Sequence, residues 1–205
     1  MDEETVESAL LALAKKAELD PMYRKQIIPL GGILKIVRAM EGNLELAKIQ
    51  VLACKALENI ALGDYQNQLA ICEVGGAEAV VGSMERHMLT DITVVEAACS
   101  ALLVMTSNCT SSTNQMSIEV SVVDVIVKCM TTHSKHAIIQ ETAFRTLANL
   151  CLENKEKLVA LSQVGGFVVM SAALAQHWDH PTVKNEAIHT LSLLFGRLAE
   201  YQAQQ

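Results

Sequence analysis

The residues of this sequence best suited to chemistry are its histidines. His133 and His136 stand three residues apart, and so do His177 and His180, which is a spacing that can place two imidazole ligands on one metal ion. No third ligand stands beside either pair. Both pairs also fall between two expected helices, as His87 does, so their shared position reflects the composition of a loop. We therefore predict no metal site.

The cysteines are the second candidates for chemistry. The six of them form no Cys-x-x-Cys pair and no tight cluster. Cys54 and Cys99 occupy the same position of an internal repeat, where Phe144 and Ile188 stand in later copies, so core packing accounts for them. The sequence contains no phosphate-binding glycine motif and no cluster of titratable side chains. We predict a protein that is not an enzyme, with no catalytic residues and no cofactor.

Composition narrows the class of partner. The 205 residues carry a formal net charge of −7, and aromatic residues make up 3% of the chain. An acidic chain repels nucleic-acid phosphates and so few rings cannot form a stacking surface for bases, so we predict no nucleic-acid partner. No apolar run approaches the roughly 20 residues that span a bilayer, so we predict no membrane partner. The acidic start, Met1-Asp2-Glu3-Glu4, is unlike a signal peptide, and we expect reduced thiols and a cytoplasmic location, with the nucleus as a second one.

An Ala-x-x-x-Leu segment recurs along the chain at intervals of 44, 45, 45 and 44 residues. The pairs are Ala9 and Leu13, Ala53 and Leu57, Ala98 and Leu102, Ala143 and Leu147, and Ala187 and Leu191. A glycine pair recurs in step, at Gly31-Gly32, Gly75-Gly76 and Gly165-Gly166, and we place Ser121-Val122 at this position in the third repeat. Two marks that share one period indicate a repeat protein.

Three helices can be read within each period. Apolar residues at helical spacing predict a short helix before the glycine pair (68–73 and 157–163), a second helix after it (33–40) and a longer third helix (49–60). The glycine pair allows the positive φ and the close approach that a steep turn between the first two helices needs. One such unit has too little core of its own, so we expect the units to stack into a continuous core.

This pattern resembles the armadillo repeat family. The residues that carry the resemblance are 73–80, around one glycine pair, and the third-helix segments 53–61 and 140–150. HEAT repeats are the alternative, but they have two helices and lack this glycine pair. The resemblance implies an all-α fold, a right-handed α-solenoid of about four three-helix repeats after an N-terminal helix. We expect one domain over 1–205, made of a helix over 4–17 and repeats over about 22–63, 66–108, 114–153 and 156–199.

The resemblance also implies where a partner would bind. In armadillo proteins the third helices line a concave groove that holds extended segments, and a Trp and, four residues later, an Asn recur along this helix in many members. The Trp positions here hold Leu11, Lys55, Ser100, Arg145 and His189, and the Asn positions hold Lys15, Asn59, Val104, Asn149 and Leu193. The candidate groove residues are Lys15, Lys55, Asn59, Ser100, Arg145, Asn149 and His189.

The kind of segment that we expect to bind is predicted from two asparagines and two cations of this groove. An Asn amide both donates to and accepts from a peptide group, so Asn59 and Asn149, about 20 Å apart if the helices are roughly 10 Å apart, would hold about six extended residues. Without Trp the groove lacks walls for basic side chains, and Lys55 and Arg145 would repel them, which disfavours an importin-like adaptor. We predict a scaffold or adaptor that binds an extended, acidic or phosphorylated protein segment. Solvated helix charges with no partner are the alternative interpretation.

Two further hypotheses remain open. A regulator of a folded partner, such as a small GTPase, would use the same groove as a broad surface, and a competing short peptide would separate this hypothesis from the first. A self-assembly module would form homo-oligomers through the N-terminal edge, where Val6, Leu10 and Leu13 need cover. The acidic segment 1–7 would otherwise cap this edge.

Overall fold

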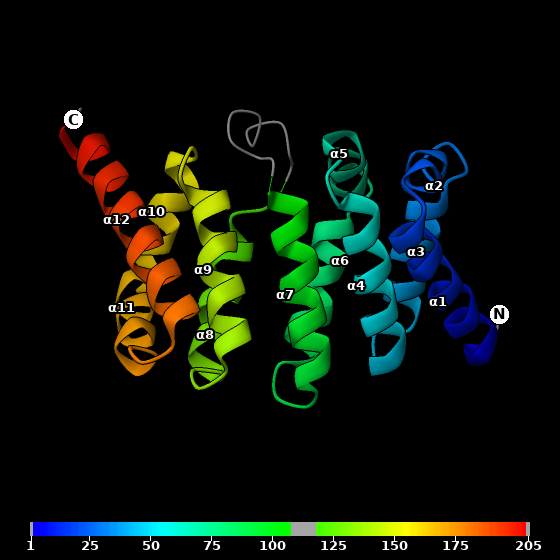
Figure 1. The fold of residues 1–205 in the computed structure, drawn as a ribbon, viewed down its shortest axis with the longest axis horizontal. Helices are drawn as coiled ribbons and strands as arrows, with labels where there is room; N and C mark the ends of the chain where they lie inside the picture. The colour runs from blue at the N-terminus through cyan, green and yellow to red at the C-terminus, as the bar shows by residue number, and fades with distance from the viewer. Residues whose placement is uncertain (1, 108–117, 204–205) are drawn as a thin grey trace. The chain divides into compact units, whose positions relative to one another are not determined.

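The computed structural model describes residues 2–107 and 118–203, and every regular element in these two ranges is an α-helix (Figure 1). The described residues fall into two compact units, each of which is described by itself. Unit 1 holds α1 to α7 together with Ile118, and unit 2 holds α8 to α12. The predicted all-α repeat fold is confirmed.

The helix bounds reproduce the expected period. Unit 1 contains α1 (Glu3–Leu19), α2 (Pro21–Gln26), α3 (Gly32–Gly42), α4 (Ala47–Ala61), α5 (Tyr65–Glu73), α6 (Gly76–His87) and α7 (Ile92–Thr106). Unit 2 contains α8 (Ser121–Thr132), α9 (Ala137–Cys151), α10 (Lys155–Gln163), α11 (Gly166–Gln176) and α12 (Pro181–Ala203). We refer to α1, α4, α7, α9 and α12 as the third helices. The expected start of the third repeat, at residue 114, lies outside the described residues.

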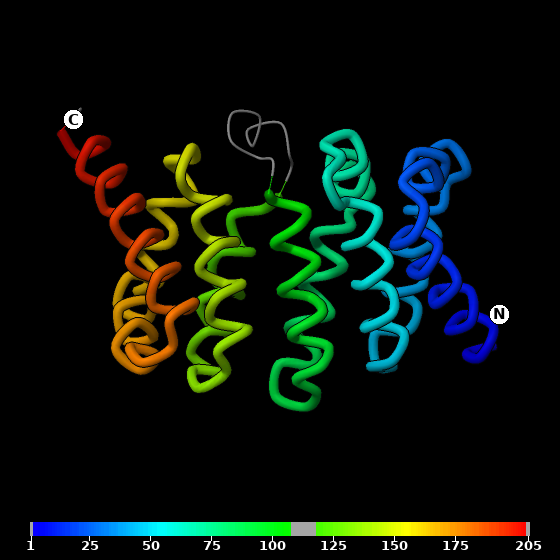
Figure 2. Tube along the Cα trace, viewed as in Figure 1, coloured from blue at the N-terminus to red at the C-terminus, as the bar shows by residue number. Residues whose placement is uncertain are grey.

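Third helices pack side by side within each unit. In unit 1, α4 lies between α1 and α7, and α3 and α6 cover one side of this row (Figure 2). In unit 2, α9 packs on α12, while α8 and α11 pack on each other and on these third helices. The third helices of a unit run in the same direction, from bottom to top in Figure 1. One side of each third helix is therefore left for solvent.

Polar side chains set where several helices begin. A side chain just before the helix that accepts hydrogen bonds from the first turn satisfies N–H groups that have no partner inside the helix. Asp64 accepts from the backbone of Gln66 and Asn67, Asp91 from Thr93, and Asn154 from Lys157. These hydrogen bonds therefore fix the residue at which each of these helices begins.

The repeat anchors form the core. Ala53 and Leu57 are completely buried, as are Cys54 and its repeat equivalent Phe144, which explains a thiol at this position by packing. Ile188, the equivalent residue of α12, is 43% exposed. The difference arises because no described helix packs on that side of α12.

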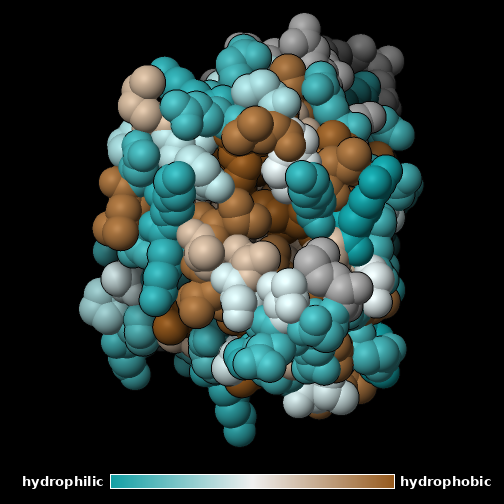
Figure 3. All heavy atoms as spheres, turned by 90° about the vertical axis from the view of Figure 1, so that its right-hand side faces the viewer, coloured by the Kyte–Doolittle hydropathy of each residue, from teal (hydrophilic) through white to brown (hydrophobic). Residues whose placement is uncertain are grey.

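The end of unit 1 that is formed by α1 to α3 is apolar. On α1, Val6, Leu10 and Ala17 are buried against α4, whereas Leu13 is only half-buried. Figure 3 shows hydrophobic side chains gathered in the middle of this end, with hydrophilic ones around them. The exposed apolar residues of α1 to α3 include Leu11, Leu19, Met22, Leu30 and Leu34.

The acidic N-terminal residues belong to the first helix. Asp2 caps α1 by accepting a hydrogen bond from the backbone of Thr5, and Glu3 and Glu4 form the first helical turn. Carboxylates at this position interact favourably with the positive end of the helix dipole. The expectation that segment 1–7 caps this edge stays a prediction.

The glycine pair makes the steep turn between first and second helices. Gly75 has φ 79°, in the left-handed region, and a Cβ atom on Gly76 would lie 2.7 Å from the carbonyl oxygen of Ile71. In the third repeat α8 begins at Ser121, as α6 begins at Gly76, so Val120 and Ser121 occupy the glycine positions. The sequence alignment was therefore wrong by one residue. Val120 has φ −62°, so this turn does not use the left-handed region.

No single helix among the described residues is long and apolar enough to cross a membrane. The pair α10 and α11 meets the length and composition criteria only when joined, and it bends by 72° at its glycine pair.

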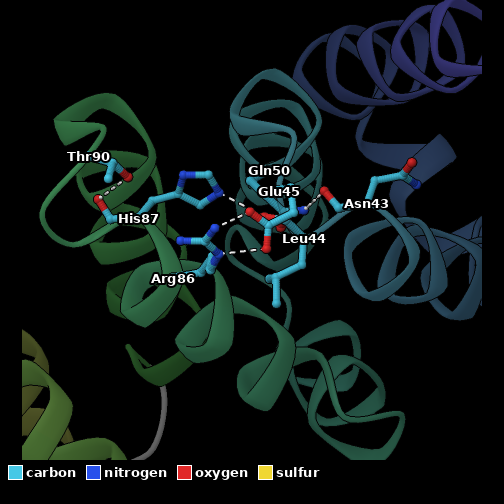
Figure 4. Close-up of polar contacts among 7 residues, drawn as sticks. All are labelled: Asn43, Leu44, Glu45, Gln50, Arg86, His87 and Thr90. Carbon is cyan, nitrogen blue, oxygen red and sulfur yellow. Dashed lines mark hydrogen bonds and ion pairs between the residues drawn. The ribbon is translucent and has the colours of Figure 1, made fainter.

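A layer of polar contacts joins consecutive repeats in unit 1 (Figure 4). The buried Gln50 donates to the backbone oxygens of Met40 and Asn43 and accepts a hydrogen bond from Ser83 of the next repeat at 2.9 Å. His87 donates from Nε2 to the carbonyl oxygen of Leu44 at 2.8 Å. The ion pair between Arg86 and Glu45 also belongs to this layer. These contacts tie the loop between α3 and α4 to the end of α6.

Unit 2 repeats this layer with one donor missing. Gln140 donates to the backbone oxygens of Met130 and His133, as Gln50 does to its own repeat. The residue equivalent to Ser83 is Ala173, and the side-chain oxygen of Gln140 is buried without a hydrogen-bond partner. A buried acceptor without a partner destabilises the fold.

The substitution Ala173→Ser is therefore expected to stabilise the protein. Its hydroxyl would stand where Ser83 stands in unit 1 and would donate to Gln140, which should raise the free energy of unfolding by about 1 kcal/mol. Urea unfolding followed by circular dichroism measures this change. The matched change Ser83→Ala should lower the same quantity. Loss of stability on Ala173→Ser would show that the site holds no room for the hydroxyl.

Candidate functional site

The third helices carry all the candidate groove residues. Lys15 lies on α1, Lys55 and Asn59 on α4, Ser100 on α7, Arg145 and Asn149 on α9, and His189 on α12. The cations and His189 are exposed, and the two asparagines and Ser100 are half-buried. Helical spacing of three and four residues explains why these positions share one face of each helix.

Unit 1 brings three of the candidates together. A hollow of about 380 Å³ lies between α1 and α4. Its lining includes Lys15, Lys55 and Asn59 together with Leu11, Leu52, Glu18 and Glu58. We call it the α1/α4 hollow.

Unit 2 brings the other three together. A hollow of about 220 Å³ lies between α9 and α12. Its lining includes Arg145, Asn149 and His189 together with Leu152, Glu186 and Leu193. We call it the α9/α12 hollow. Asn59 and Asn149 belong to different units, and the distance expected between them stays a prediction.

Ser100 lines neither of these two hollows. Its helix, α7, carries a single charged residue, Glu96, and presents the half-buried Leu103 and Val104 near Ser100. The exposed side of α7 therefore carries one carboxylate, Glu96, four residues before Ser100, and is otherwise neutral and partly apolar, in contrast with the side of α4 that carries Lys55 and Glu58.

Sequence reasoning missed the carboxylates of both hollows. Glu18 and Glu58 line the first, and Glu186 lines the second. Glu58 follows Lys55 by three residues and Glu186 precedes His189 by three, so the spacing that puts side chains on one helical face could have found both.

Glu58 has an unusual environment for a carboxyl group. Burial raises its pKa above the ordinary value, and the nearby Lys55 ammonium partly offsets this effect. A partner that covered Glu58 further would raise its pKa again, because removing water disfavours the charged form.

Asn59 already makes one hydrogen bond inside the protein. Its side-chain nitrogen donates to the backbone oxygen of Ala14 on α1 at 3.0 Å. An amide nitrogen has two N–H groups and an amide oxygen has two lone pairs, so this bond uses one of its four hydrogen-bonding positions. The contact holds the amide between α1 and α4, in the wall of the α1/α4 hollow.

The cations of this face differ from many others in the protein. Lys15, Lys55 and Arg145 form no ion pair or cation–π contact with another residue in the ranges 2–107 and 118–203. Elsewhere Lys48 pairs with Glu7, for example. Three cations on the exposed face are thus available to an anionic group.

The histidines that suggested a metal have another role. His177 donates from Nε2 to the carbonyl oxygen of Ser134 at 2.7 Å, which repeats the contact of His87 with Leu44 in unit 1. Among the described residues, no group of three or more His, Cys, Asp or Glu side chains is placed to hold a metal ion. His87 and His177 thus join the loops of consecutive repeats.

The described cysteines are buried. Burial raises the pKa of the Cys54 thiol and of the Cys151 thiol to about 12. A thiol with such a pKa stays protonated at neutral pH and is a poor nucleophile. Cys109 lies outside the described residues.

Solved structures resemble this chain. An engineered protein is 27% identical with a TM-score of 0.80, and the match covers 95% of this chain and 45% of that one. A designed armadillo repeat protein in complex with the peptide (KR)4 is 20% identical with a TM-score of 0.77, over 94% of this chain and 77% of that one. A further engineered protein is 23% identical with a TM-score of 0.70, and the match covers 96% of this chain and 93% of that one.

These likenesses show the fold. The chain spans less than half the length of the first of these structures. No protein-family model and no curated protein matches the chain.

Proposed function

Since the chain has an armadillo-type repeat fold, we propose that it is a non-enzymatic scaffold that binds an extended, acidic segment of a partner protein on the exposed face of its third helices. With this binding activity the protein would act as an adaptor in the cytoplasm. The fold alone does not choose a ligand, so the proposal depends on the side chains of the two hollows.

One observation carries the acidic preference. Lys15, Lys55 and Arg145 are exposed on the third helices, and none of them forms an ion pair with another described residue. Asn59 and Asn149 stand beside them, with amides that can bind a peptide backbone in addition to their internal contacts.

The designed armadillo protein described above takes the opposite kind of ligand. Its partner is the basic peptide (KR)4. In this chain Lys55 and Arg145 are exposed on the third helices and would repel such a peptide, whereas they would attract carboxylates. The same fold therefore supports an opposite charge preference here.

A pair of peptides of opposite charge tests the proposal. Fluorescein-labelled (Asp-Glu)4 and (Lys-Arg)4 would be titrated with the protein and followed by fluorescence anisotropy at low and moderate salt. We expect the acidic peptide to bind at least tenfold more tightly, with an affinity that falls as salt rises. Tighter binding of the basic peptide would overturn the proposal.

Charge reversal locates the binding face. Arg145→Glu should weaken binding of (Asp-Glu)4 by at least tenfold. The control is Lys135→Glu, which makes the same change of charge on an exposed loop residue of the same unit. Equal losses for both variants would mean that net charge, and not the hollow, attracts the peptide.

The apolar end of unit 1 favours a second candidate function, association with a second copy of the chain. Leu34 on α3 is 38% exposed, and Figure 3 shows hydrophobic side chains gathered in the middle of this end of the unit. Light scattering over a range of concentrations would show a mass above 22.2 kDa that Leu34→Glu returns to the monomer value. A mass that stays at the monomer value at every concentration would exclude this function.

A further inference from the structure

Two third helices, α1 and α12, each leave one side uncovered. Within a unit each third helix packs on the next one, as α1 does on α4 and α9 does on α12. We call the side of a third helix that meets the next third helix its following side, and the side that meets the previous one its preceding side. Among the described residues, no third helix precedes α1 and none follows α12. The preceding side of α1 and the following side of α12 are therefore the two open sides of this repeated contact.

The following side of α12 is apolar and exposed. Ile188 is 43% exposed and Phe195 is 49% exposed. Their equivalents on α9 are Phe144 and Cys151, which lie one turn on either side of Ala148, a residue that lines the hollow toward α12. Both equivalents are completely buried. On α12, two apolar side chains thus occupy positions that the next third helix covers on α9.

The preceding side of α1 carries short side chains. On α4 the preceding side meets α1, because Asn59 donates to a backbone oxygen of α1 and Ala56, one turn before it, is completely buried. The equivalents on α1 are Lys15 and Ala12, and both are exposed. Ser8, one turn before Ala12, is exposed as well. Ala12 and Ser8 leave room beside α1 for a larger apolar side chain of another helix.

The two open sides are complementary in size and neutral in charge. Ile188 and Phe195 are large, whereas Ser8 and Ala12 are small. The ring of Phe195 stacks on Phe167 of α11 with centroids 4.5 Å apart, so it is held in place before any contact forms. None of the four contact residues carries a charge, so bringing the two sides together removes no ion of theirs from water.

The direction of the helices favours one way of joining two copies. The third helices of a unit run in the same direction, and the following side of one meets the preceding side of the next (Figure 1). A second copy that places its α1 on α12 repeats this contact. A two-fold axis would instead bring each side against an identical one, large residues against large or small against small.

We propose that the chain associates head to tail with a second copy, with the following side of α12 in one copy packed on the preceding side of α1 in the other. Ile188 and Phe195 then lie against Ser8 and Ala12. This inference rests on the second candidate function, association through the end of unit 1, and names the surface that covers α1. Each contact joins unit 2 of one copy to unit 1 of another. Because every copy carries both sides, the assembly can add further copies.

Two variants that each alter one side test the inference. Ile188→Glu places a carboxylate on the following side of α12, and Ala12→Glu places one on the preceding side of α1. Light scattering over a range of concentrations should give masses above 22.2 kDa for the parent chain and the monomer mass for each variant alone. A carboxylate buried without a partner should weaken the contact at least about tenfold. The control Ile138→Glu makes the same change at an exposed residue of α9 and should assemble like the parent chain.

A mixture of the two variants distinguishes head-to-tail from two-fold association. The Ala12→Glu copy keeps an intact α12, and the Ile188→Glu copy keeps an intact α1. A single contact can form between these two copies, so an equimolar mixture should reach twice the mass of one chain and no more. A two-fold contact through α1 or through α12 would instead leave one of the two variants assembled by itself.

The results also separate the inference from the second candidate function. Assembly that Ala12→Glu disrupts and Ile188→Glu does not would overturn the head-to-tail contact and leave association through the end of unit 1. Disruption by Ile188→Glu alone would overturn both, as would a parent chain that stays monomeric at every concentration. Two monomeric variants whose mixture also stays monomeric would overturn the pairing of these two sides. Circular dichroism would establish that the variants keep the helical content of the parent chain.

Discussion

Gly76→Ala is expected to destabilise the protein by about 3 kcal/mol, whereas Gly82→Ala in the same helix should stabilise it slightly. A Cβ atom on Gly76 would lie 2.4 Å from the side chain of Ile71 and 2.7 Å from its backbone oxygen. The backbone oxygen cannot move away without changing the turn between α5 and α6. A Cβ atom on Gly82 would meet nothing within 4 Å.

Chemical unfolding in urea measures both changes. The two variants add the same methyl group to the same helix, so a difference in sign between them isolates the close approach at Gly76 from the general preference of helices for Ala. Gly166→Ala repeats the test in unit 2, where the Cβ atom would lie 2.8 Å from the backbone oxygen of Leu161. If Gly76→Ala were as stable as the parent chain, the proposed role of the second glycine in packing the first helix against the second would be wrong.

Gln50→Leu is expected to lower the free energy of unfolding by about 2 kcal/mol. The side chain of Gln50 is completely buried, and it joins the backbone oxygens of Met40 and Asn43 to the hydroxyl of Ser83. Leucine has nearly the same size but can make none of these bonds, so the buried hydroxyl of Ser83 loses its acceptor. The loss would fall on the junction between the first and second full repeats.

Two comparisons test this explanation for Gln50. Gln140→Leu should cost less, because the side-chain oxygen of Gln140 has no partner to lose. The double variant Gln50→Leu/Ser83→Ala should be more stable than Gln50→Leu alone, since it removes the hydroxyl that was left without an acceptor. Additive effects of the two substitutions would contradict a direct interaction between Gln50 and Ser83.

The fold was largely predictable because its signals are local and repeated. Apolar residues at helical spacing marked α3, α4, α5 and α10, and the glycine pairs marked the turns between first and second helices. The third repeat was placed one residue out of register, because Val120 and Ser121 replace the glycines that define this position elsewhere. The start of the second helix was predicted from the glycine pair alone, so this prediction failed in the repeat that lacks the pair.

The candidate site was less predictable than the fold. Sequence positions on the third helices identified Lys15, Lys55 and Arg145 as groove residues, and the structure places each of them in one of the two hollows. The residue types alone did not reveal that Glu18 of α1 shares a hollow with Lys55 of α4 or that Asn59 donates to Ala14. Both facts depend on how one third helix approaches the next.

The sequence by itself determined the period, the three-helix unit and the exposed face of each third helix, because helical spacing fixes which residues of one helix lie together. Only the tertiary structure decided which charges and leucines share a hollow. Arg145 and Glu186 are 41 positions apart in the chain and line one hollow because α9 packs on α12. Glu18 of α1 and Lys55 of α4 likewise line one hollow because these two helices pack side by side, whereas local sequence patterns describe each helix by itself.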